Sequence, residues 1–339
     1  MSRVLITGLA TYWGGRLAQI LEDNPQVELI VGVDRHDPKV PLERTEFVRV
    51  KEDYGALRRI VEVAGIDTVM HTDVIVNSTS ASNSAIHEQN VIGTMNLLAA
   101  AAVENSPVRK MIVKSSSMVY GAGKADPQIF RETDHRSEPP RTRIEKSLLE
   151  AEDYVRDFAQ DNPHVTVSLF RVANVIGDDI DTPMLHALRL PAVPSIAGFD
   201  PLIQVAHVDD VASALAYAVH EDLVGVYNVA GDGAVPWSEV RKIAARPQLP
   251  LPAYGIEIAA AALRTSRIID LPPELLAMLR FGRQLDNTLV KQAGFKFTHT
   301  TSSALHDYIE GLRLKRVVGE PAKLYEYEDD VENFVHRHS

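Results

Sequence analysis

Short apolar runs and amphipathic segments alternate along the first half of the chain. Apolar runs of this length predict buried strands, and apolar residues that recur at helical spacing predict helices. Predicted strands cover residues 4–6, 29–33, 46–50, 67–71, 110–114 and 165–170, and predicted helices cover 56–63, 90–103 and 143–158. Strands that alternate with helices are typical of a parallel sheet with helices on both faces. We therefore expect an α/β fold with a doubly wound parallel sheet.

The alternation becomes irregular after Arg171, where prolines accumulate and short segments replace the regular pattern. Two further strands are predicted at 203–208 and 225–229, and helices at 238–244, 256–264 and 273–279. We expect residues 171–320 to supply the remaining strands of the sheet, interleaved with a small C-terminal α+β lobe that binds substrate. Residues 321–339 form a polar C-terminal tail in this interpretation.

The first strand is followed at once by a glycine-containing turn and then by helix-forming residues. Gly8 allows the tight turn, and Gly14 allows close packing of the helix on the strand. Thr11 stands at the middle position, where a pyrophosphate approaches the backbone of such a loop. Tyr12 and Trp13 begin the helix, whose free N–H groups and dipole attract phosphate. The order of strand, turn and helix thus predicts a phosphate-binding loop.

Asp34 strengthens this interpretation because it ends the predicted strand 29–33, twenty positions after Gly14. A carboxylate there can accept hydrogen bonds from the adenosine ribose of NAD. We therefore predict a dinucleotide-binding Rossmann domain over residues 1–170. The alternative is an ordinary strand, turn and helix followed by an exposed Asp34.

Composition and charge exclude several classes of function. The net charge of −11 gives no electrostatic support to nucleic-acid binding. The absence of cysteine excludes disulfides and cysteine-based metal sites, and it fits a reducing cytoplasm. Met1 leads directly into a strand, so we expect no signal peptide, and the apolar stretch 256–263 is too short to span a bilayer. We expect a cytoplasmic protein with a small-molecule substrate.

Several motifs occur in a fixed order along the chain. They are Thr7-Gly8…Gly14, Asp34, Asn90-Val-Ile-Gly93, Ser115-Ser116-Ser117-Met-Val-Tyr120-Gly121, Lys146, Arg171-Val-Ala-Asn174 and His207-Val-Asp209-Asp210. This order resembles the extended short-chain dehydrogenase/reductases, the NAD-dependent epimerase/dehydratase family, of which UDP-glucose 4-epimerase is the best-known type. The resemblance runs from Met1 to about Phe297 and is strongest to actinobacterial proteins of the epimerase type.

The resemblance implies an NAD site. The residues at its cofactor positions are Gly8, Thr11, Tyr12, Trp13, Gly14, Asp34, Arg35, His71, Asn90 and Lys146. Asp34 favours NAD because a carboxylate repels the 2′-phosphate of NADP. Arg35 together with Lys51 could accept that phosphate, so NADP stays open. Asp73 departs from the family pattern, since it brings a negative charge near the diphosphate.

The resemblance also implies a catalytic group of Ser, Tyr and Lys, in which the Tyr is the acid–base residue. Ser116 and Lys146 match two positions, but Thr142 stands where the Tyr belongs, one turn before the Lys. Thr142→Tyr is therefore expected to restore the family geometry. Three alternatives remain. In the first, another group replaces the Tyr, with Tyr120, Glu145 and His135 as candidates. In the second, positioning, hydride transfer and a water suffice for catalysis at a reduced rate. In the third, the protein binds a dinucleotide without turnover.

Substrate contacts are implied at Ser117, Tyr120, Asn174 and Gln204. Ile203 occupies the position of an Arg that pairs with the diphosphate of nucleotide sugars in the family. This departure favours a less charged substrate, such as a hydroxy or keto compound or a free sugar derivative. Arginines further along the chain could compensate, namely Arg264, Arg267, Arg280 and Arg283.

Three further expectations concern metals, capping and assembly. We expect no metal site, because neither the Asp178–Asp181 loop nor His336 and His338 has a convincing ligand spacing. His207, Asp209 and Asp210 are expected to hold the crossover strand and to cap the following helix. The resemblance implies a homodimer through a four-helix bundle of the segments 90–103 and 143–158. The leading hypothesis is an epimerase or oxidoreductase, and the alternative is a degenerate dinucleotide sensor or interaction protein.

Overall fold

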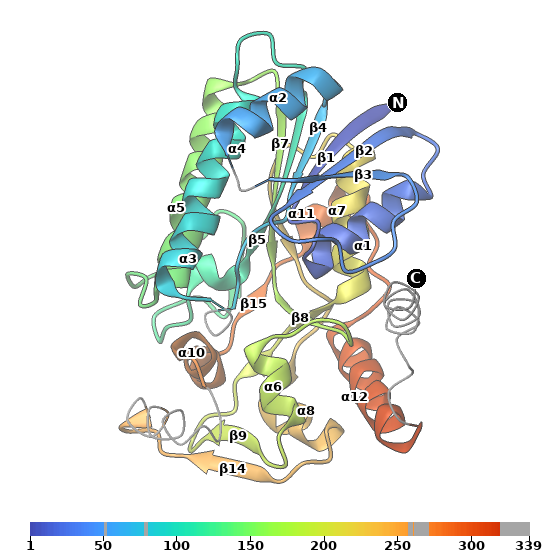
Figure 1. Ribbon diagram of the computed structural model, residues 1–339. Coiled ribbons are helices and arrows are strands. Elements are labelled where there is room, and N and C mark those ends of the chain that lie inside the picture. Colours follow the sequence, from blue (N-terminus) through green and yellow to red (C-terminus); the bar gives the residue numbers. More distant parts are fainter. Residues whose placement is uncertain (51–52, 78–80, 257–259, 261–270, 319–339) are drawn as a thin grey trace.

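The computed structural model describes residues 1–50, 53–77, 81–256, 260 and 271–318 (Figure 1). Lys51, Arg264, Arg267 and the histidines of the C-terminal tail lie outside these residues, as does most of the helix expected at 256–264. No helix among the described residues combines the length and apolar character needed to cross a membrane.

A seven-stranded parallel sheet forms the centre of the described fold, with the order β12-β7-β5-β4-β1-β2-β3. Its strands are β1 (Ser2–Thr7), β2 (Val27–Asp34), β3 (Thr45–Arg49), β4 (Thr68–His71), β5 (Lys110–Ser116), β7 (Thr166–Val172) and β12 (Gly225–Val229). The chain moves outward from β1 to β3 and then returns to β4 on the other side of β1. Ligands of doubly wound proteins bind at the carboxyl ends of the strands where the order reverses. The expected doubly wound sheet is therefore confirmed, and its reversal lies between β1 and β4.

Helices cover both faces of the sheet (Figure 1). On one face, α1 (Tyr12–Glu22) packs beside α7 (Val208–His220), and on the other lie α2 (Tyr54–Ala64), α4 (Thr94–Ala101) and α5 (Arg143–Asp161). Each face has its own buried cluster, which includes Leu17 and Leu215 on the first face and Leu57 and Leu97 on the second. Burial of these apolar stripes holds the layers together.

The helix expected at 90–103 differs from the expectation at both ends. Helical structure begins with α3 (Asn83–His87), continues through the π-helical turn η1 (Glu88–Gly93) and ends with α4 at Ala101. A π turn holds one more residue than an α turn, so it breaks the helical spacing of apolar positions that sequence reasoning uses. Such turns occur often at functional sites, and Asn90 lies within this one.

The remaining elements form a lobe below the carboxyl ends of the sheet (Figure 1). Its strands pair two by two: β8 (Asn174–Ile176) with β11 (Val205–His207), β9 (Val193–Ile196) with β14 (Gln248–Leu251), and β10 (Leu202–Ile203) with β13 (Val235–Pro236). The single strand expected at 203–208 is thus two strands with different partners. A further pair, β6 (Ile129–Phe130) and β15 (Gln284–Leu285), joins the segment after β5 to the end of the lobe.

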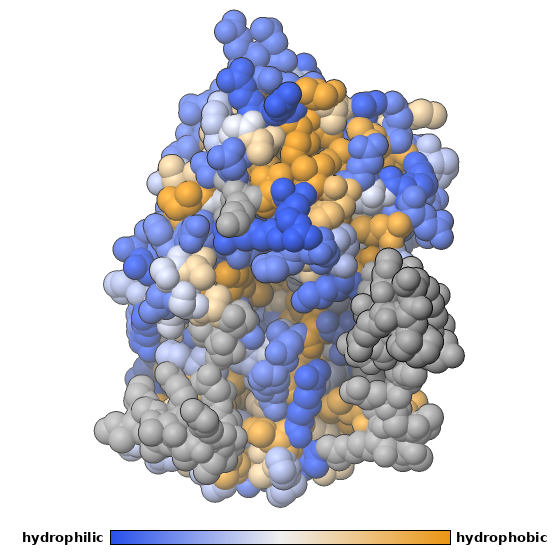
Figure 2. All heavy atoms as spheres, in the orientation of Figure 1, coloured by the Kyte–Doolittle hydropathy of each residue, from blue (hydrophilic) through white to orange (hydrophobic). Residues whose placement is uncertain are grey.

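The helices of the lobe are α6 (Pro183–Arg189), α8 (Trp237–Ile243), α10 (Pro273–Phe281) and α12 (Thr301–Val318), whereas α11 (Thr288–Gln292) packs against β12 of the sheet (Figure 1). Because β12 joins the sheet only after β8 to β11, the lobe and the sheet interleave along the chain. Figure 2 shows apolar side chains gathered in the upper half of the viewed face, over the sheet, with a polar surface around them. The carboxyl ends of the strands and the lobe together frame the candidate site.

Candidate active site at the carboxyl ends of the strands

The turn after β1 is as tight as its glycines predict. Gly8 has a φ of +74°, and a Cβ atom on Gly8 would lie 2.9 Å from the Cα atom of Asp73. A Cβ atom on Gly14 would lie 2.1 Å from the carbonyl oxygen of Gly8. Larger residues are therefore excluded at both positions, which fixes α1 close to the strand.

Thr11 caps α1 rather than leaving its backbone open. Its Oγ1 atom accepts a hydrogen bond from the Gly14 N–H at 3.2 Å and donates one to the Gly8 carbonyl oxygen at 2.6 Å. The N–H groups of Tyr12 and Trp13 lie in the first turn of α1, where a helix has no backbone acceptor to offer. These two groups are the donors that the turn presents to an anion.

Asp34 lines a narrow groove beside this turn. Its Oδ2 atom accepts from the Ala10 N–H and its Oδ1 atom from the His36 N–H, both at 2.9 Å. The groove is lined by Gly8, Asp34, Arg35, His71 and Asp73, with apolar walls from Val33, Val50, Leu57 and Leu97. An oriented carboxylate between apolar walls fits the ribose and adenine of a dinucleotide. Arg35 reaches over this groove and lies 3.9 Å from Glu88.

Two expected cofactor residues have structural partners. The ring nitrogens of His71 lie 2.8 Å from Thr7 Oγ1 and 2.9 Å from Thr94 Oγ1, and burial lowers the pKa of His71 to about 4. The buried amide of Asn90 accepts a hydrogen bond from the Ile75 N–H and donates one to the Ile75 carbonyl oxygen. It also donates to the Ser147 hydroxyl at 3.1 Å. His71 therefore joins β1 and β4 to α4, and Asn90 holds the loop after β4 in place.

Ser116 lies in a small pocket of about 80 Å³ at the carboxyl ends of β5 and β7. Its Oγ atom accepts a hydrogen bond from the Met118 N–H at 3.3 Å. Asn174 lines the same pocket, and its Nδ2 atom lies 2.9 Å from the sulfur of Met278. The neighbouring Ser117 accepts a hydrogen bond from Arg283 at 3.2 Å. The structure thus brings together Ser116, Ser117 and Asn174.

Lys146 does not reach this pocket. Its side chain is 56% exposed on the outer face of α5, where Nζ lies 3.7 Å from Glu150. The buried residues of α5 next to it are Ile144, Glu145, Ser147 and Leu148, which are at most 4% exposed. Lys146 therefore does not line the pocket of Ser116, and its role as a ribose ligand stays a prediction.

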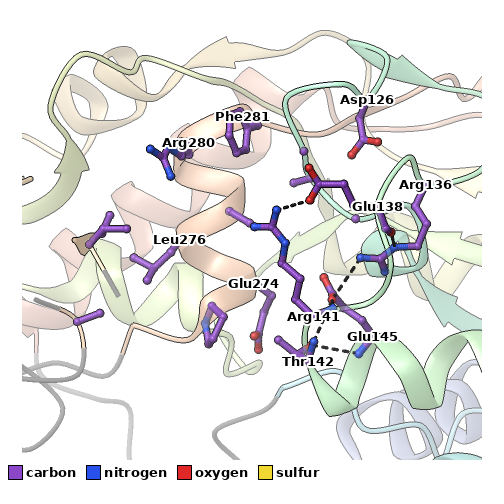
Figure 3. Close-up of a pocket in the computed structure, with 17 residues that line it drawn as sticks. Asp126, Arg136, Glu138, Arg141, Thr142, Glu145, Glu274, Leu276, Arg280 and Phe281 are labelled. Carbon is purple, nitrogen blue, oxygen red and sulfur yellow. Dashed lines mark hydrogen bonds and ion pairs between the residues drawn. The ribbon is translucent and has the colours of Figure 1, made fainter. Parts of the chain in front are cut away.

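Thr142 is the N-cap of α5 and not a member of its inner face. Its hydroxyl accepts from the Glu145 N–H while the Glu145 carboxylate accepts from the Thr142 N–H, both at 3.2 Å. It lines a second pocket, of about 290 Å³. Figure 3 shows Thr142, Arg141 and Glu145 on one wall of that pocket, with Arg280 and Phe281 on α10 across from them. Residue 142, where the resemblance expects the Tyr, therefore does not line the pocket of Ser116.

The three candidates for replacing the Tyr do not line the Ser116 pocket. The Tyr120 hydroxyl donates to Asn228 at 2.8 Å, and burial raises its pKa to about 12. His135 is exposed. The Glu145 carboxylate is held by the N–H groups of Arg141 and Thr142. The side chain of Gln204 is also hydrogen-bonded within the protein. Its Nε2 atom donates to the Gly231 carbonyl oxygen, and its Oε1 atom accepts from the Leu285 N–H.

Two cations line this pocket; sequence reasoning missed Lys114 and named Arg283 only as one of four arginines without a location. Lys114, on β5, is 2% exposed, and burial lowers its pKa to about 8. Arg283 follows α10 and is 7% exposed, and burial lowers its pKa to about 10. Lys114 has a sequence signal, because a lysine at the end of the apolar run of a central strand, two residues before Ser116, is unusual. Arg283 carries no such signal, because the lobe places it.

The residues around the start of α7 act as expected. His207 caps this helix by accepting from the Asp209 N–H at 3.3 Å, and its ring stacks on His299 at 3.8 Å. Asp210 accepts from the N–H groups of Thr298 and His299, both at 2.9 Å. Within the described ranges, no three His, Asp or Glu side chains are arranged to hold a metal ion.

Comparison with known proteins places this geometry in a family. Residues 4–230 match the model of the NAD dependent epimerase/dehydratase family. Uncharacterized proteins of Mycobacterium bovis and Mycobacterium tuberculosis are 32% identical over 321 residues, which is 93% of this chain and 85% of theirs.

Solved structures share the fold at low identity. UDP-glucose 4-epimerase of Thermotoga maritima, with UDP-glucose, has a TM-score of 0.71 at 19% identity, over 92% of this chain and 98% of that one. UDP-glucuronic acid 4-epimerase of Bacillus cereus, with NAD, has a TM-score of 0.67 at 18% identity. The match covers 91% of this chain and 99% of that one. The family match covers more than half of the chain, and it agrees with the doubly wound sheet and the glycine turn. The chain therefore belongs to the NAD-dependent epimerase/dehydratase family.

Proposed function

We propose that this protein binds NAD and catalyses an epimerase or oxidoreductase reaction on a small hydroxy or keto compound or sugar derivative. The observation that carries the proposal is the meeting of two features at the carboxyl ends of the strands. The groove of Asp34 lies beside the turn after β1, and the pocket of Ser116 lies at the ends of β5 and β7. Both features flank the point where the strand order reverses.

The residues that would hold NAD are distributed along this edge. Asp34 would accept from the ribose hydroxyls, and the N–H groups of Tyr12 and Trp13 would donate to the diphosphate. NAD, when bound, supplies hydride transfer. NAD is favoured over NADP because Asp34 would repel a 2′-phosphate. The solved epimerase of Bacillus cereus, which contains NAD, supports the same choice.

On the substrate side, Ser116 would hold the reacting oxygen by a hydrogen bond, and Asn174 would orient a second polar group. Neither group is an effective acid or base near neutral pH. The acid–base role therefore falls outside the Ser116, Thr142 and Lys146 set expected from the sequence.

A second candidate function is a dinucleotide-binding sensor or interaction protein without turnover. The observation that favours it is the exposed position of Lys146 on α5, outside the pocket of Ser116, where the resemblance implied acid–base chemistry. The two candidates share the cofactor groove and differ only in turnover.

One experiment tests both candidates. The protein is titrated with NAD and, separately, with NADP, and bound protein is then incubated with hydroxylated compounds while reduced nicotinamide is followed by absorbance. We expect NAD to bind more tightly than NADP. We also expect Asp34→Asn to weaken NAD binding about tenfold, because a charged hydrogen bond is lost. Asp153→Asn, on the exposed face of α5, is the matched control. Failure of both nucleotides to bind contradicts the proposal. An epimerase returns the hydride to its product and leaves no reduced nicotinamide, so the compounds are also analysed for new isomers by chromatography. Binding with neither reduction nor isomer formation favours the sensor.

A further inference from the structure

The pocket of Ser116 contains two buried cations that form no ion pair within the described part of the chain. The Lys114 ammonium lies over the ring of Trp13, whose centroid is 5.0 Å from Nζ. Arg283 donates from Nε to the Gly121 carbonyl oxygen at 2.7 Å and from Nη1 to the Ser117 hydroxyl at 3.2 Å. Both partners of Arg283 are uncharged.

The charge balance of the pocket is positive. Its lining includes Lys114 and Arg283 as cations and Glu274 as the one carboxylate among its described residues. Two positive charges less one negative charge leave a net charge of +1, in a chain whose overall charge is −11. A concentration of positive charge in one small cavity of an acidic protein indicates an anionic ligand.

Burial makes these two charges costly in the free protein. A buried charge is usually paired, because removal of water from an ion disfavours its charged form unless an opposite charge replaces the water. Burial lowers the pKa of Lys114, and it lowers the pKa of Arg283 more than the nearby carboxylates Glu145, Asp126 and Glu274 raise it. An oxyanion between them would restore the missing opposite charge.

We infer that this pocket binds a carboxylate or phosphate group of the substrate through the buried side chains of Lys114 and Arg283. The inference rests on the proposed function, because it names the substrate class for the same site. Arg283 presents a planar fork of donors that suits either oxyanion, and Lys114 supplies a compact charge. Ser116 and Asn174 remain for the hydroxyl or keto group beside the anion.

The size of the pocket limits the anion to a small molecule. A cavity of about 80 Å³ has room for an acidic group and a few neighbouring atoms, whereas pockets for drug-sized ligands occupy about 300–1,000 Å³. The substrate class is thus a hydroxylated acid, such as a sugar acid, or a sugar phosphate. The two members of this class share the oxyanion and differ in its charge and geometry.

The test measures binding of three compounds by isothermal titration calorimetry. Glucuronate supplies a carboxylate, glucose 6-phosphate supplies a phosphate, and glucose is the uncharged control. We expect one of the two anions to bind at least tenfold more tightly than glucose. The preferred anion decides between the two members of the class. Equal binding of all three compounds, or of none, overturns the inference.

Four variants connect the binding to the pocket. We expect Lys114→Met and Arg283→Gln each to weaken anion binding at least tenfold, since each removes a charged donor. The matched controls are Lys242→Met and Arg156→Gln, which remove the same charges from exposed pairs with Glu239 and Asp153. We expect the controls to bind like the parent protein. Folding of each variant is checked by circular dichroism, and Arg283→Lys replaces Arg283→Gln if the latter does not fold. Anion binding that survives in folded pocket variants overturns the inference.

A titration in the presence of saturating NAD separates this inference from the proposed function. We expect the anion to bind alongside NAD, with its affinity reduced less than twofold. Displacement of the anion by NAD would assign Lys114 to the cofactor and overturn the inference. If NAD does not bind while the anion does, the cofactor proposal fails and the anion site stands on its own.

Discussion

Thr142 stabilises α5 through reciprocal hydrogen bonds at the start of the helix. Its hydroxyl and the Glu145 carboxylate each accept from the backbone of the other residue. A Tyr side chain has no acceptor within reach of the same N–H group. We therefore expect Thr142→Tyr to lower the free energy of unfolding by about 1 kcal/mol, measured by urea denaturation. We also expect it to produce no gain in turnover.

Thr142→Ser is the matched control, because it keeps the hydroxyl and is expected to unfold like the parent protein. A rise in turnover for Thr142→Tyr, with reduction of nicotinamide as the readout, would show that residue 142 reaches the reacting atoms after all.

At the scale of the element, His71 joins three secondary-structure elements through one neutral ring. Its nitrogens contact Thr7 on β1 and Thr94 on α4, and the ring itself lies on β4. The pKa of His71 is about 4 in the folded protein, against an ordinary value of 6.5 for a histidine in an unfolded chain. The unfolded chain therefore binds more protons between these values, so stability is present above pH 6.5 and is lost as the pH falls toward 4.

We expect this single residue to contribute roughly 3 kcal/mol to that loss. The measurement is the free energy of unfolding between pH 7 and 4 for the parent protein and for His71→Gln, which cannot take up the proton. The difference between the two curves should grow as the pH falls. Parallel curves would assign the acid sensitivity to other groups.

The elements most accessible to sequence reasoning are the buried strands of the sheet. Residues 110–114 are an apolar run with a Lys at each end, and every residue of β5 is buried. The glycine turn and Asp34 were also predictable from the sequence, because the positive φ of Gly8 and the contact of Gly14 with Gly8 belong to one strand–turn–helix unit.

Sequence reasoning failed where a position depends on rotation about a helix or on distant segments. A lysine at 146 matches a motif, yet the capping box at Thr142 and the buried pair Ile144 and Leu148 determine which face of α5 turns inward. Arg283 reaches the pocket only because α10 and β15 fold back against Gly121 and β6. No local pattern around Arg283 records that contact.

At the scale of the whole molecule, the outer surface of α4 and α5 suggests how two copies would meet. Ile92, Met95 and Tyr154 are 38–41% exposed on this surface. Figure 1 shows α4 and α5 side by side along one side of the sheet, with α2 next to α4 and α3 next to α5. Association of two copies here would bury these side chains in a four-helix bundle.

We expect the protein to be a dimer by light scattering after size-exclusion chromatography. We also expect the double variant Ile92→Glu with Met95→Glu to be monomeric, because each new charge would be buried at the interface. Val63→Glu, on the 80% exposed side chain of α2, is the control and should stay dimeric. A parent protein that elutes as a monomer contradicts this assembly.

The contact between Lys114 and Trp13 gives the chain an optical reporter. The sequence contains two tryptophans, and the indole of Trp237 is buried with its N–H on the Pro194 carbonyl oxygen. Replacement of Trp237 by Phe would leave Trp13 as the sole indole fluorophore, with a cation 5.0 Å from the ring centroid. Any event that draws this ammonium away or neutralises it would change the field at the indole and shift its emission. Occupancy next to Ser116 would then be visible in the light that the protein emits, with no added label.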